Sequence, residues 1–432
     1  MQPGARLQAA IEVLSEIGAR GRAASVALAD WGRAHRFAGS ADRAWIGNLV
    51  YDSLRRKQSL SHFMQSDTWR AIALAALRHS WSMAPAEIAA LCTGEGFCPE
   101  PLTPDEERGL ANADLSGAAP WVQGDYPEWL HGSFAAAFGD DAIREGRALA
   151  TRAPADLRVN SLKATRDKVM KALLRHGAAE TPYSPLGVRL PPREAGARSP
   201  NVEAEPAHGR GWFEIQDEGS QIAALLAGAG PRLQVADICA GAGGKTLAMA
   251  ARMQNTGQIY AYDADPIRFR PIFERLKRAG ARNVQTLPPG QDGALSALEG
   301  RMDLVLIDAP CSGTGVWRRR PDAKWRLNPA QLMERTAEQS RLLFIAAPLV
   351  KPGGTLAYVT CSLLPEENEK QIEDFLESNP AFTALNLADR AARILSRPIK
   401  NHLPPGKPGL LLTPAWHETD GFYIALLSKK QQ

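Results

Sequence analysis

The stretch LVLIDAPCSGTG, residues 304–315, decides how the chain folds. A continuous run of branched apolar residues ends in Asp308, and Cys311 follows three residues later in a loop that is rich in glycine. An apolar run without alternation predicts a strand that is buried on both faces, as in a parallel sheet covered by helices. Ligands of such sheets bind at the carboxyl ends of the strands, so we expect the carboxylate and the thiol at that edge.

Apolar runs of the same kind alternate with helical segments through the C-terminal half of the chain. This alternation predicts an α/β fold, a doubly wound and mostly parallel Rossmann-like sheet, over residues 216–430. The predicted strands lie at 233–239, 257–263, 302–310, 353–361 and 421–427, and a helix is predicted at 365–378.

The first half of the chain has a different pattern. Residues 1–120 are rich in alanine and carry apolar residues at helical spacing, which predicts an all-helical domain. Residues 126–215 mix both patterns and predict a small α/β module. The predicted elements are helices at 49–64, 68–81, about 130–150 and 164–177, a helix that begins after Thr103, a strand at 156–160 and a Pro-rich bend at 182–200.

The totals limit the class of protein. A chain of 432 residues, at roughly 100–200 residues per domain, is expected to form two or three domains. No apolar run approaches the ~20 residues that span a bilayer, and Glu12 and Glu16 interrupt the N-terminal region, so we expect neither a signal peptide nor a membrane partner. Five cysteines without CxxC spacing predict neither disulfides nor a metal site, which indicates a reducing cytoplasm. We expect a monomer.

The net charge of +4 is weak support for a polyanionic partner, but the local distribution of charge is more informative. The segment WRRRPDAKWR, residues 317–326, carries five basic side chains and two tryptophans against one aspartate. Clustered cations with flat aromatic rings suit phosphates and unstacked bases. The alternative is a solvated charged loop.

The loop after the first strand, DICAGAGGKT at 237–246, fits three kinds of site. It ends like a nucleotide-binding P-loop in Gly244-Lys245-Thr246, but Cys239 stands where that motif needs its first glycine. It begins like a nicotinamide fingerprint, but Thr246 replaces the third glycine. The third possibility is a loop for S-adenosylmethionine, whose carboxylate can use the N–H groups at the start of the following helix.

Two acids bear on this choice. Asp263 ends the second predicted strand, 22 positions after Gly241, where an acid can bind ribose hydroxyls. This suits a dinucleotide or S-adenosylmethionine better than a P-loop ligand, although Asp263 could instead cap a helix. Asp292 follows the third expected strand and could reach the adenine amino group, or it could be a turn residue before Gly293.

Two thiols are expected at the same edge of the sheet. Cys311 follows one predicted strand and Cys361 ends the next. A single cysteine is more often a small buried apolar residue, but two at successive strand ends beside a cofactor loop indicate chemistry. A thiolate that adds to carbon 6 of cytosine makes carbon 5 nucleophilic toward a methyl donor. An acid at the position of Asp308 can donate a hydrogen bond or a proton to ring nitrogen 3.

These residues resemble the Sun/Fmu family of RNA 5-methylcytosine methyltransferases. The paired PCS and TCS motifs are the most specific part of the likeness, which covers about residues 120–430. One departure is visible, because the family loop reads CAAPGGKT and this chain has Gly241 and Ala242 in place of Ala and Pro. The segments that carry the resemblance are DLRVNSLKAT (156–165), GWFEIQDEGSQ (211–221), DICAGAGGKT, DAPCSGTGVWRRRPDAKW (308–325), TCSLLPEENEKQI (360–372) and DGFYIALL (420–427).

The resemblance implies roles that the residues alone do not order. It implies that Cys361 is the nucleophile, that Cys311 assists product release, and that Asp308 is a third catalytic residue. S-adenosylmethionine is the implied cofactor, and an RNA cytosine, unstacked from its helix, is the implied target. The implied cofactor contacts are Cys239, Ala240, Gly241, Ala242, Gly243, Gly244, Lys245, Asp263, Arg268, Asp292 and Asp308, and the implied RNA contacts are Arg318, Arg319, Arg320 and Lys324.

The resemblance also bears on the RNA that is modified. Residues 40–56 look like part of a NusB-like RNA-binding domain, which favours 16S ribosomal RNA as the substrate. The same chemistry on tRNA is an alternative. A P-loop NTPase with Asp308 as its second acid, and a non-catalytic RNA-binding assembly factor, are alternatives from other classes.

Overall fold

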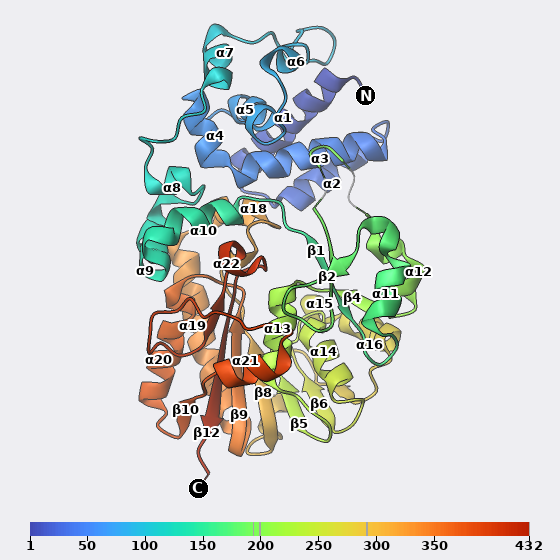
Figure 1. Ribbon diagram of the computed structural model, residues 1–432, viewed down its shortest axis with the longest axis vertical. Helices are drawn as coiled ribbons and strands as arrows, with labels where there is room; N and C mark the ends of the chain where they lie inside the picture. Colours follow the sequence, from blue (N-terminus) through green and yellow to red (C-terminus); the bar gives the residue numbers. More distant parts are fainter. Residues whose placement is uncertain (193, 198–199, 291–292, 432) are drawn as a thin grey trace. The chain divides into compact units, whose positions relative to one another are not determined.

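The computed structural model describes residues 1–192, 194–197, 200–290 and 293–431. The chain forms two compact units, each of which is drawn in Figure 1. The first, called here the helical unit, comprises Met1–Ala153, Pro192–Pro200 and Val316–Leu327. The second, called here the sheet unit, comprises Pro154–Pro191, Asn201–Gly315 and Asn328–Gln432.

The helical unit is built from short amphipathic helices around a core of leucine, isoleucine and alanine. Residues such as Leu14 on the first helix, Leu49 on the third and Leu74 on the fifth are fully buried there. Its helices are α1 (Pro3–Arg20), α2 (Ala24–Ala34), α3 (Ser40–Arg55), α4 (Lys57–Met64), α5 (Trp69–His79), α6 (Pro85–Ala89), α7 (Pro104–Ala111), α8 (Pro120–Gln123), α9 (His131–Phe138), α10 (Ala142–Leu149) and α18 (Pro321–Arg326).

Two predicted helices that the structure places in this unit, one of them predicted as part of the small α/β module, are each divided. The helix predicted at 49–64 is broken at Arg56 into α3 and α4, because the backbone N–H and hydroxyl of Ser59 in the first turn of α4 donate to the distant Asp125. The helix predicted at about 130–150 is broken between α9 and α10 at Gly139, where φ is +53° and ψ is −125°, a conformation open mainly to glycine. The predicted helix start at Thr103 is confirmed, since its hydroxyl accepts from the Glu106 N–H.

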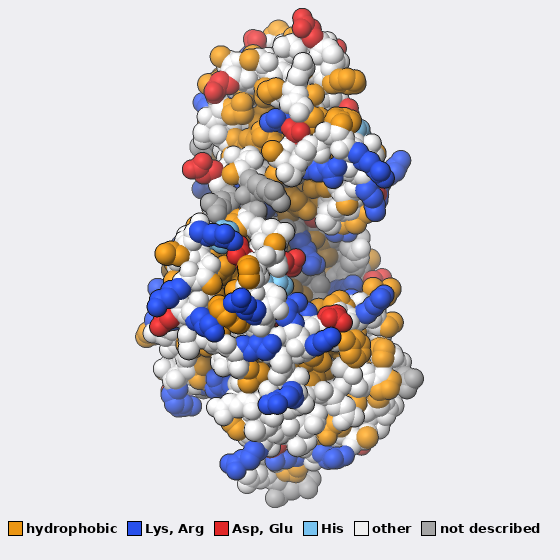
Figure 2. All heavy atoms as spheres, turned by 90° about the vertical axis from the view of Figure 1, so that its right-hand side faces the viewer, with side chains coloured by type: hydrophobic (Ala, Val, Ile, Leu, Met, Phe, Trp, Pro, Cys, Tyr) orange, Lys and Arg blue, Asp and Glu red, His pale blue; other side chains and the backbone are white. Residues whose placement is uncertain are grey.

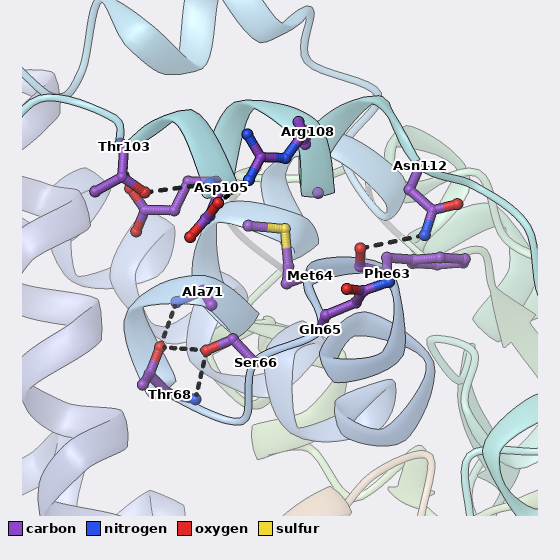
Figure 3. Close-up of a pocket in the computed structure, with 12 residues that line it drawn as sticks. Phe63, Met64, Gln65, Ser66, Thr68, Ala71, Thr103, Asp105, Arg108 and Asn112 are labelled. Atoms are coloured by element: carbon purple, nitrogen blue, oxygen red, sulfur yellow. Dashed lines mark hydrogen bonds and ion pairs between the residues drawn. The ribbon is translucent and has the colours of Figure 1, made fainter.

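A cavity of about 620 Å³ in the helical unit lies between α4, α5 and α7 (Figure 3). Its polar side chains bond to one another and to backbone: the Asn112 amide donates to the Phe63 carbonyl, and the Thr68 hydroxyl accepts from the Ala71 N–H. Neither the glycine loop nor the thiols are among the residues that line it.

The sheet unit begins with a small four-stranded antiparallel sheet in the order β2-β3-β1-β4. The strand predicted at 156–160 is confirmed as β1, whose Leu157 and Val159 are buried against the helix that follows. The bend predicted at 182–200 contains a strand, β3, which prolines flank on both sides and which pairs with β1. The elements are β1 (Ala155–Val159), α11 (Arg166–Ala172), β2 (Ala179–Glu180), β3 (Gly187–Leu190), α12 (Pro206–Gly209) and β4 (Phe213–Ile215).

The larger sheet has the order β10-β12-β9-β8-β5-β6-β7, with β11 paired to β12. The strands from β9 to β7 in this order are parallel, whereas β12 runs antiparallel between β9 and β10. The predicted fold class is therefore confirmed. Its strands are β5 (Gln234–Asp237), β6 (Gln258–Ala261), β7 (Val284–Thr286), β8 (Met302–Asp308), β9 (Val350–Thr360), β10 (Phe382–Ala384), β11 (Leu410–Leu412) and β12 (Phe422–Lys429).

Helices cover this sheet, and α13, α14 and α21 share a core with one face of its central strands. Figure 1 shows these three helices in front of the strands and α19 and α20 beside them. No helix in the described ranges is both long enough and apolar enough to cross a bilayer. The helices are α13 (Glu218–Ala227), α14 (Gly244–Arg252), α15 (Pro266–Phe269), α16 (Ile272–Ala279), α17 (Gly293–Ser296), α19 (Pro329–Ala346), α20 (Glu369–Ser378), α21 (Ala388–Ile394) and α22 (Pro414–His417).

Candidate active site

The two thiols lie together at the carboxyl edge of the larger sheet. Strands β8 and β9 are parallel and in register, with Asp308 opposite Val359. Each strand therefore ends at the same edge, and the sulfur atoms of Cys311 and Cys361 are 3.4 Å apart. Both are free thiols and both are partly exposed. A substrate that reaches one sulfur atom from outside the sheet also meets the other.

The backbone around the thiols is tied across three segments that are distant in the sequence. The Gly315 N–H donates to the Cys361 carbonyl at 3.0 Å, and the Gly421 N–H donates to the Gly315 carbonyl at 2.9 Å. A Cβ on Gly315 would collide with the backbone of Gly421, which explains why glycine stands there. The loop after β8, the end of β9 and the start of β12 are thus fixed against one another.

A buried carboxylate holds the loop that carries Cys311. Glu367 is fully buried, and its side chain accepts from the Ser312 N–H at 2.7 Å and from the Ser312 hydroxyl. The Gln339 amide on α19 donates both to Glu367 at 3.1 Å and to the Pro310 carbonyl at 2.9 Å. Charge-assisted hydrogen bonds of this kind orient a loop strongly. This role of Glu367 was not predicted from the sequence.

The two thiols differ in their surroundings. The hydrogen bond with Cys361 raises the pKa of the Cys311 thiol, and burial and the negative charge of Glu367 raise it further. Cys311 is therefore a protonated thiol at neutral pH, able to donate toward the sulfur of Cys361. The thiol of Cys239 is buried under the sheet edge, and burial raises its pKa as well, so it is not a reactive group.

Asp308 forms an ion pair with a lysine of the glycine loop. The Lys245 ammonium lies 2.7 Å from Asp308 Oδ2, and the lysine side chain is 6% exposed whereas the aspartate side chain is 35% exposed. The ammonium also lies 5.2 Å from the centre of the Phe422 ring. Lys245 was predicted as a cofactor contact, but its amine is directed at Asp308, beside the thiols. The pair offers a proton donor and an acceptor at one point of the edge.

The glycine loop passes from β5 into α14 through two residues with positive φ. Gly243 has φ of +82°, and a Cβ there would lie 2.6 Å from Ile272; Gly241 has φ of +49°. Below the loop, Asp237 accepts from the Thr246 hydroxyl at 2.7 Å, while its other oxygen has no partner within the described residues. Burial, reinforced by neighbouring carboxylates, raises the pKa of Asp237 to about 7.

Asp263, at the end of β6, faces the same loop. Its carboxylate accepts from the Gly241 N–H at 2.7 Å and from the Asp265 N–H at 2.9 Å. Arg268 lies on α15 close to Gly241, and a Cβ on Gly241 would be 3.9 Å from its guanidinium. Gly241 and Ala242 stand in this loop where the family has Ala and Pro. The Arg275 guanidinium donates to the Ala242 carbonyl at 2.8 Å and so supports this part of the loop. Asp292 lies outside the described residues.

This donor set fits S-adenosylmethionine. The loop of residues 239–245 leads into the N-terminus of α14, whose free N–H groups suit a carboxylate. Asp263 offers oxygens at the strand end where ribose hydroxyls bind in such sheets. Asp308 and the thiols lie at the neighbouring strand ends, so a methyl donor held here would be close to both.

The predicted RNA contacts lie in the helical unit and differ widely in exposure. Lys324 and Arg318 are buried, Arg319 is partly buried and Arg320 is exposed. The Lys324 ammonium donates to the carbonyls of Arg55 at 2.8 Å and of Asp125. Of the basic side chains predicted to face RNA, Arg320 is the one that the structure leaves open to solvent. Lys and Arg side chains are also more frequent than acidic ones on the face drawn in Figure 2.

The chain is similar to characterised families over most of its length. Residues 227–428 match the family described as 16S rRNA methyltransferase RsmB/F, and residues 126–193 match the ferredoxin-like domain of RsmF/B-like methyltransferases. The protein named probable ribosomal RNA small subunit methyltransferase B from Synechocystis sp. is 33% identical over 335 residues, which cover 75% of this chain and 71% of that protein. Ribosomal RNA small subunit methyltransferase B from Salmonella paratyphi B is 34% identical over 307 residues, which cover 71% of this chain and 66% of that protein.

Solved structures show the same fold. The protein PH0851 has a TM-score of 0.72 and 26% identity over 99% of both chains. A methyltransferase homolog protein from Pyrococcus horikoshii has a TM-score of 0.58 and 30% identity, over 73% of this chain and 100% of that chain. NSun6 from Pyrococcus horikoshii, at 22% identity and a TM-score of 0.61, shares the fold over 71% of this chain and 99% of its own. The predicted methyltransferase fold and the predicted S-adenosylmethionine cofactor are confirmed by these likenesses.

Proposed function

Because the chain belongs to the 16S rRNA methyltransferase RsmB/F family, we propose that it transfers a methyl group from S-adenosylmethionine to carbon 5 of a cytosine in 16S ribosomal RNA. The observation that carries the cytosine chemistry is the separation of 3.4 Å between the sulfur atoms of Cys311 and Cys361. Methyl transfer to an oxygen or to an exocyclic nitrogen needs no thiol, whereas carbon 5 of cytosine needs a nucleophile to activate its ring.

The methyl donor would lie against the glycine loop. The loop of residues 239–245 and Asp263 would hold S-adenosylmethionine, which supplies an electrophilic methyl group when it is bound. The N–H groups at the start of α14 would receive its carboxylate, and Asp263 would exchange its hydrogen bonds with Gly241 and Asp265 for ribose hydroxyls.

Cys361 is the proposed nucleophile. Its sulfur, as a thiolate, forms a bond to carbon 6 of the cytosine, and the ring electrons move toward carbon 5 and nitrogen 3. The Lys245–Asp308 pair stabilises the charge that develops at nitrogen 3 by donating a hydrogen bond or a proton there. The neutral thiol of Cys311 donates toward the Cys361 sulfur, which lies 3.4 Å away.

Release of the product reverses the first bond. Once carbon 5 carries the methyl group, its proton passes to a water molecule and the electron pair of that C–H bond forms the double bond between carbons 5 and 6. The bond between carbon 6 and the Cys361 sulfur then breaks, and its electron pair goes to the sulfur. We assign this step to Cys311, which is next to the sulfur that must leave and which Glu367 and Ser312 hold in place. The protonated Cys311 thiol can then donate a hydrogen bond to the leaving Cys361 thiolate.

The product tests the proposal directly. The protein is incubated with 16S ribosomal RNA, total tRNA and isotope-labelled S-adenosylmethionine, and the RNA is digested to nucleosides for mass spectrometry. We expect labelled 5-methylcytidine from ribosomal RNA. Label in 5-methylcytidine from tRNA alone would replace the proposed substrate, and label in any other nucleoside would overturn the proposed chemistry.

The roles of the two thiols are tested with a pair of variants. Cys311→Ala should accumulate a covalent protein–RNA adduct that survives denaturing electrophoresis, because the bond to Cys361 forms but breaks slowly. Cys361→Ala should form no adduct and should lose at least about a thousandfold in methyl transfer. Adducts that persist in Cys361→Ala would show that the assignment is reversed.

A further inference from the structure

A basic stretch without any acid precedes the last strand of the sheet unit. Residues 390–417 carry five Lys or Arg side chains and no Asp or Glu, whereas the whole chain has 51 Lys or Arg and 47 Asp or Glu. The stretch runs from α21 through β11 to the end of α22. None of the residues predicted to bind the cofactor or RNA lies in it, so it is a separate basic feature of the molecule.

Helix α22, which ends this stretch, lies at the edge of the larger sheet that carries the thiols. Strand β11 leads into α22 and pairs with β12, with Leu412 opposite Phe422. Strand β12 in turn pairs with β9, with Tyr423 opposite Thr360, the residue before Cys361. Figure 1 shows α22 at the start of β12, the end of that strand opposite to the C-terminus. RNA held at α22 would therefore be next to the strand end where Cys361 lies.

Two aromatic rings stack at this place, with cations beside them. The rings of His402 and Trp416 have centres 4.3 Å apart and planes inclined by 25°, and both side chains are partly exposed. The Lys400 ammonium lies 5.1 Å from the centre of the Trp416 ring. The Arg397 guanidinium lies 4.2 Å from the centre of the Tyr183 ring. Rings that alternate with cations suit the bases and phosphates of single-stranded nucleic acid.

The cations of this stretch are open to solvent. Arg393, Arg397 and Lys400 are all exposed. In the described part of the chain, Arg397 and Lys400 contact aromatic rings and form no ion pair with a carboxylate. Glu418, the first acid after the stretch, lies 3.6 Å from the Arg189 guanidinium. The positive charge of Arg397 and Lys400 is therefore available to an anion from outside the protein.

Hydrogen bonds fix the loop before β11 against α22. Burial lowers the pKa of His417, so its ring is neutral at pH 7. Its Nδ1 accepts from the Thr413 N–H at 2.9 Å, and its Nε2 donates to the Lys400 carbonyl at 2.9 Å. The Asn401 side-chain oxygen accepts from the Leu411 N–H at 3.2 Å. A surface that is already held in place loses little conformational freedom when a ligand binds.

We infer that the surface around Trp416 binds single-stranded RNA beside the target nucleotide. This Trp416 surface comprises Arg397, Lys400, His402 and Trp416. A base extends the stack of His402 and Trp416, and the two cations bind backbone phosphates. The inference rests on the proposed function for the choice of RNA as the partner. It goes beyond that function because it places the nucleotides that flank the target on one named surface of the sheet unit.

The probe is a short oligocytidine RNA labelled with fluorescein. It is titrated with the full-length protein in the absence of S-adenosylmethionine, and its anisotropy is measured over a range of salt concentrations. Trp416→Ala should weaken binding about tenfold with an unchanged salt dependence, because stacking on a ring neutralises no phosphate. Lys400→Met should weaken binding about threefold and reduce the slope of log Kd against log salt by about 0.7.

Matched controls separate this surface from any exposed ring or cation. Phe344→Ala removes an exposed ring on α19, and Lys430→Met removes an exposed cation near the C-terminus; both should bind as the wild type does. Trp416→Phe, which keeps a ring for stacking, should retain most of the affinity. A Kd in Trp416→Ala equal to that in Phe344→Ala would overturn the inference, as would a salt slope in Lys400→Met equal to that in Lys430→Met.

The result is decisive even if Trp416→Ala does not fold, because the Lys400 side chain is exposed and its replacement leaves the packing of α22 intact. The assay also separates this inference from the proposed reaction, since no methyl group is transferred in it. Absence of 5-methylcytidine from the product assay would refute the reaction and leave the binding result unchanged. Equal RNA binding by all variants would refute the Trp416 surface and leave the reaction unchanged.

Discussion

Residues 308–327 form one continuous stretch of sequence, yet its two halves belong to different units and use their polar side chains in opposite ways. In the first half, Asp308 and Cys311 are partly exposed at a sheet edge, next to Lys245 and Cys361. In the second half, Lys324 is 1% exposed, and its ammonium donates to backbone carbonyls of the helical unit. The first half is arranged for chemistry and the second half for packing.

A cluster of basic and aromatic residues can therefore serve packing as well as RNA binding. The indole N–H of Trp325 donates to the Leu54 carbonyl at 2.6 Å, and the Arg55 guanidinium donates to the Arg318 carbonyl at 2.9 Å. Lys324 lies 4.8 Å from the Trp325 ring centre. Cation–π contacts and side-chain-to-backbone bonds are also what hold a segment inside a fold. The amino-acid composition of a segment does not distinguish RNA binding from packing inside the fold. The atoms that its side chains contact make that distinction.

The largest effect we expect from this comparison is on the pH dependence of stability. Burial lowers the pKa of Lys324 from 10.5 to about 7. Between those two values the unfolded chain binds a proton that the folded chain does not, so stability is lowest below pH 7 and rises as the pH increases toward 10.5. The slope attributable to this one amine is roughly 1.4 kcal/mol per pH unit at most. Urea unfolding of the full chain at a series of pH values measures it.

The slope should disappear in Lys324→Met, because no amine remains to titrate. Lys430→Met is the matched control, since this lysine is exposed near the C-terminus and its loss should leave the slope unchanged. An equal pH dependence in the wild type and in Lys324→Met would show that the buried amine is not titrating in this window.

An intermediate effect is expected in the first half of the stretch. In Glu367→Gln an amide replaces the carboxylate that accepts from the backbone and hydroxyl of Ser312, so one of those donors meets an N–H group instead of an oxygen. The loop that carries Cys311 then loses its fixed position. We expect kcat for methyl transfer to fall roughly tenfold while the affinity for S-adenosylmethionine stays the same.

Glu377→Gln, at an exposed position on α20, is the control for this substitution and should keep full activity. If Glu367→Gln instead weakened cofactor binding with kcat unchanged, Glu367 would act through the glycine loop and not through the thiols.

The sequence was informative wherever the signal was local. Apolar runs such as 302–310 marked the buried strands, and the position of a residue just after a strand was enough to bring Cys311 and Cys361 to one edge, because parallel strands in register end together. The capped start at Thr103 was equally local. These features depend on residues within a few positions of one another, or on the geometry that every parallel sheet shares.

What could not be predicted depends on contacts between residues distant in the sequence. The break at Arg56 follows from Asp125, which lies 66 positions after the Ser59 that it binds. The support of Ser312 comes from Glu367, 55 positions later. The burial of Lys324 depends on Arg55, 269 positions earlier. No periodicity or motif of a single chain contains such pairings.

The smallest expected effect concerns the basic side chain of the second half that is exposed to solvent. Arg320 could meet a phosphate without any rearrangement of the helical unit, whereas Lys324 could not leave its carbonyl partners without breaking the packing of its segment. Arg320→Ala should therefore weaken RNA binding about threefold and reduce the dependence of log Kd on log salt by about one. Filter binding over a range of salt concentrations measures both quantities. Arg335→Ala on α19 is the control, and an RNA affinity in Arg320→Ala equal to that of the control would assign the whole of residues 316–327 to packing.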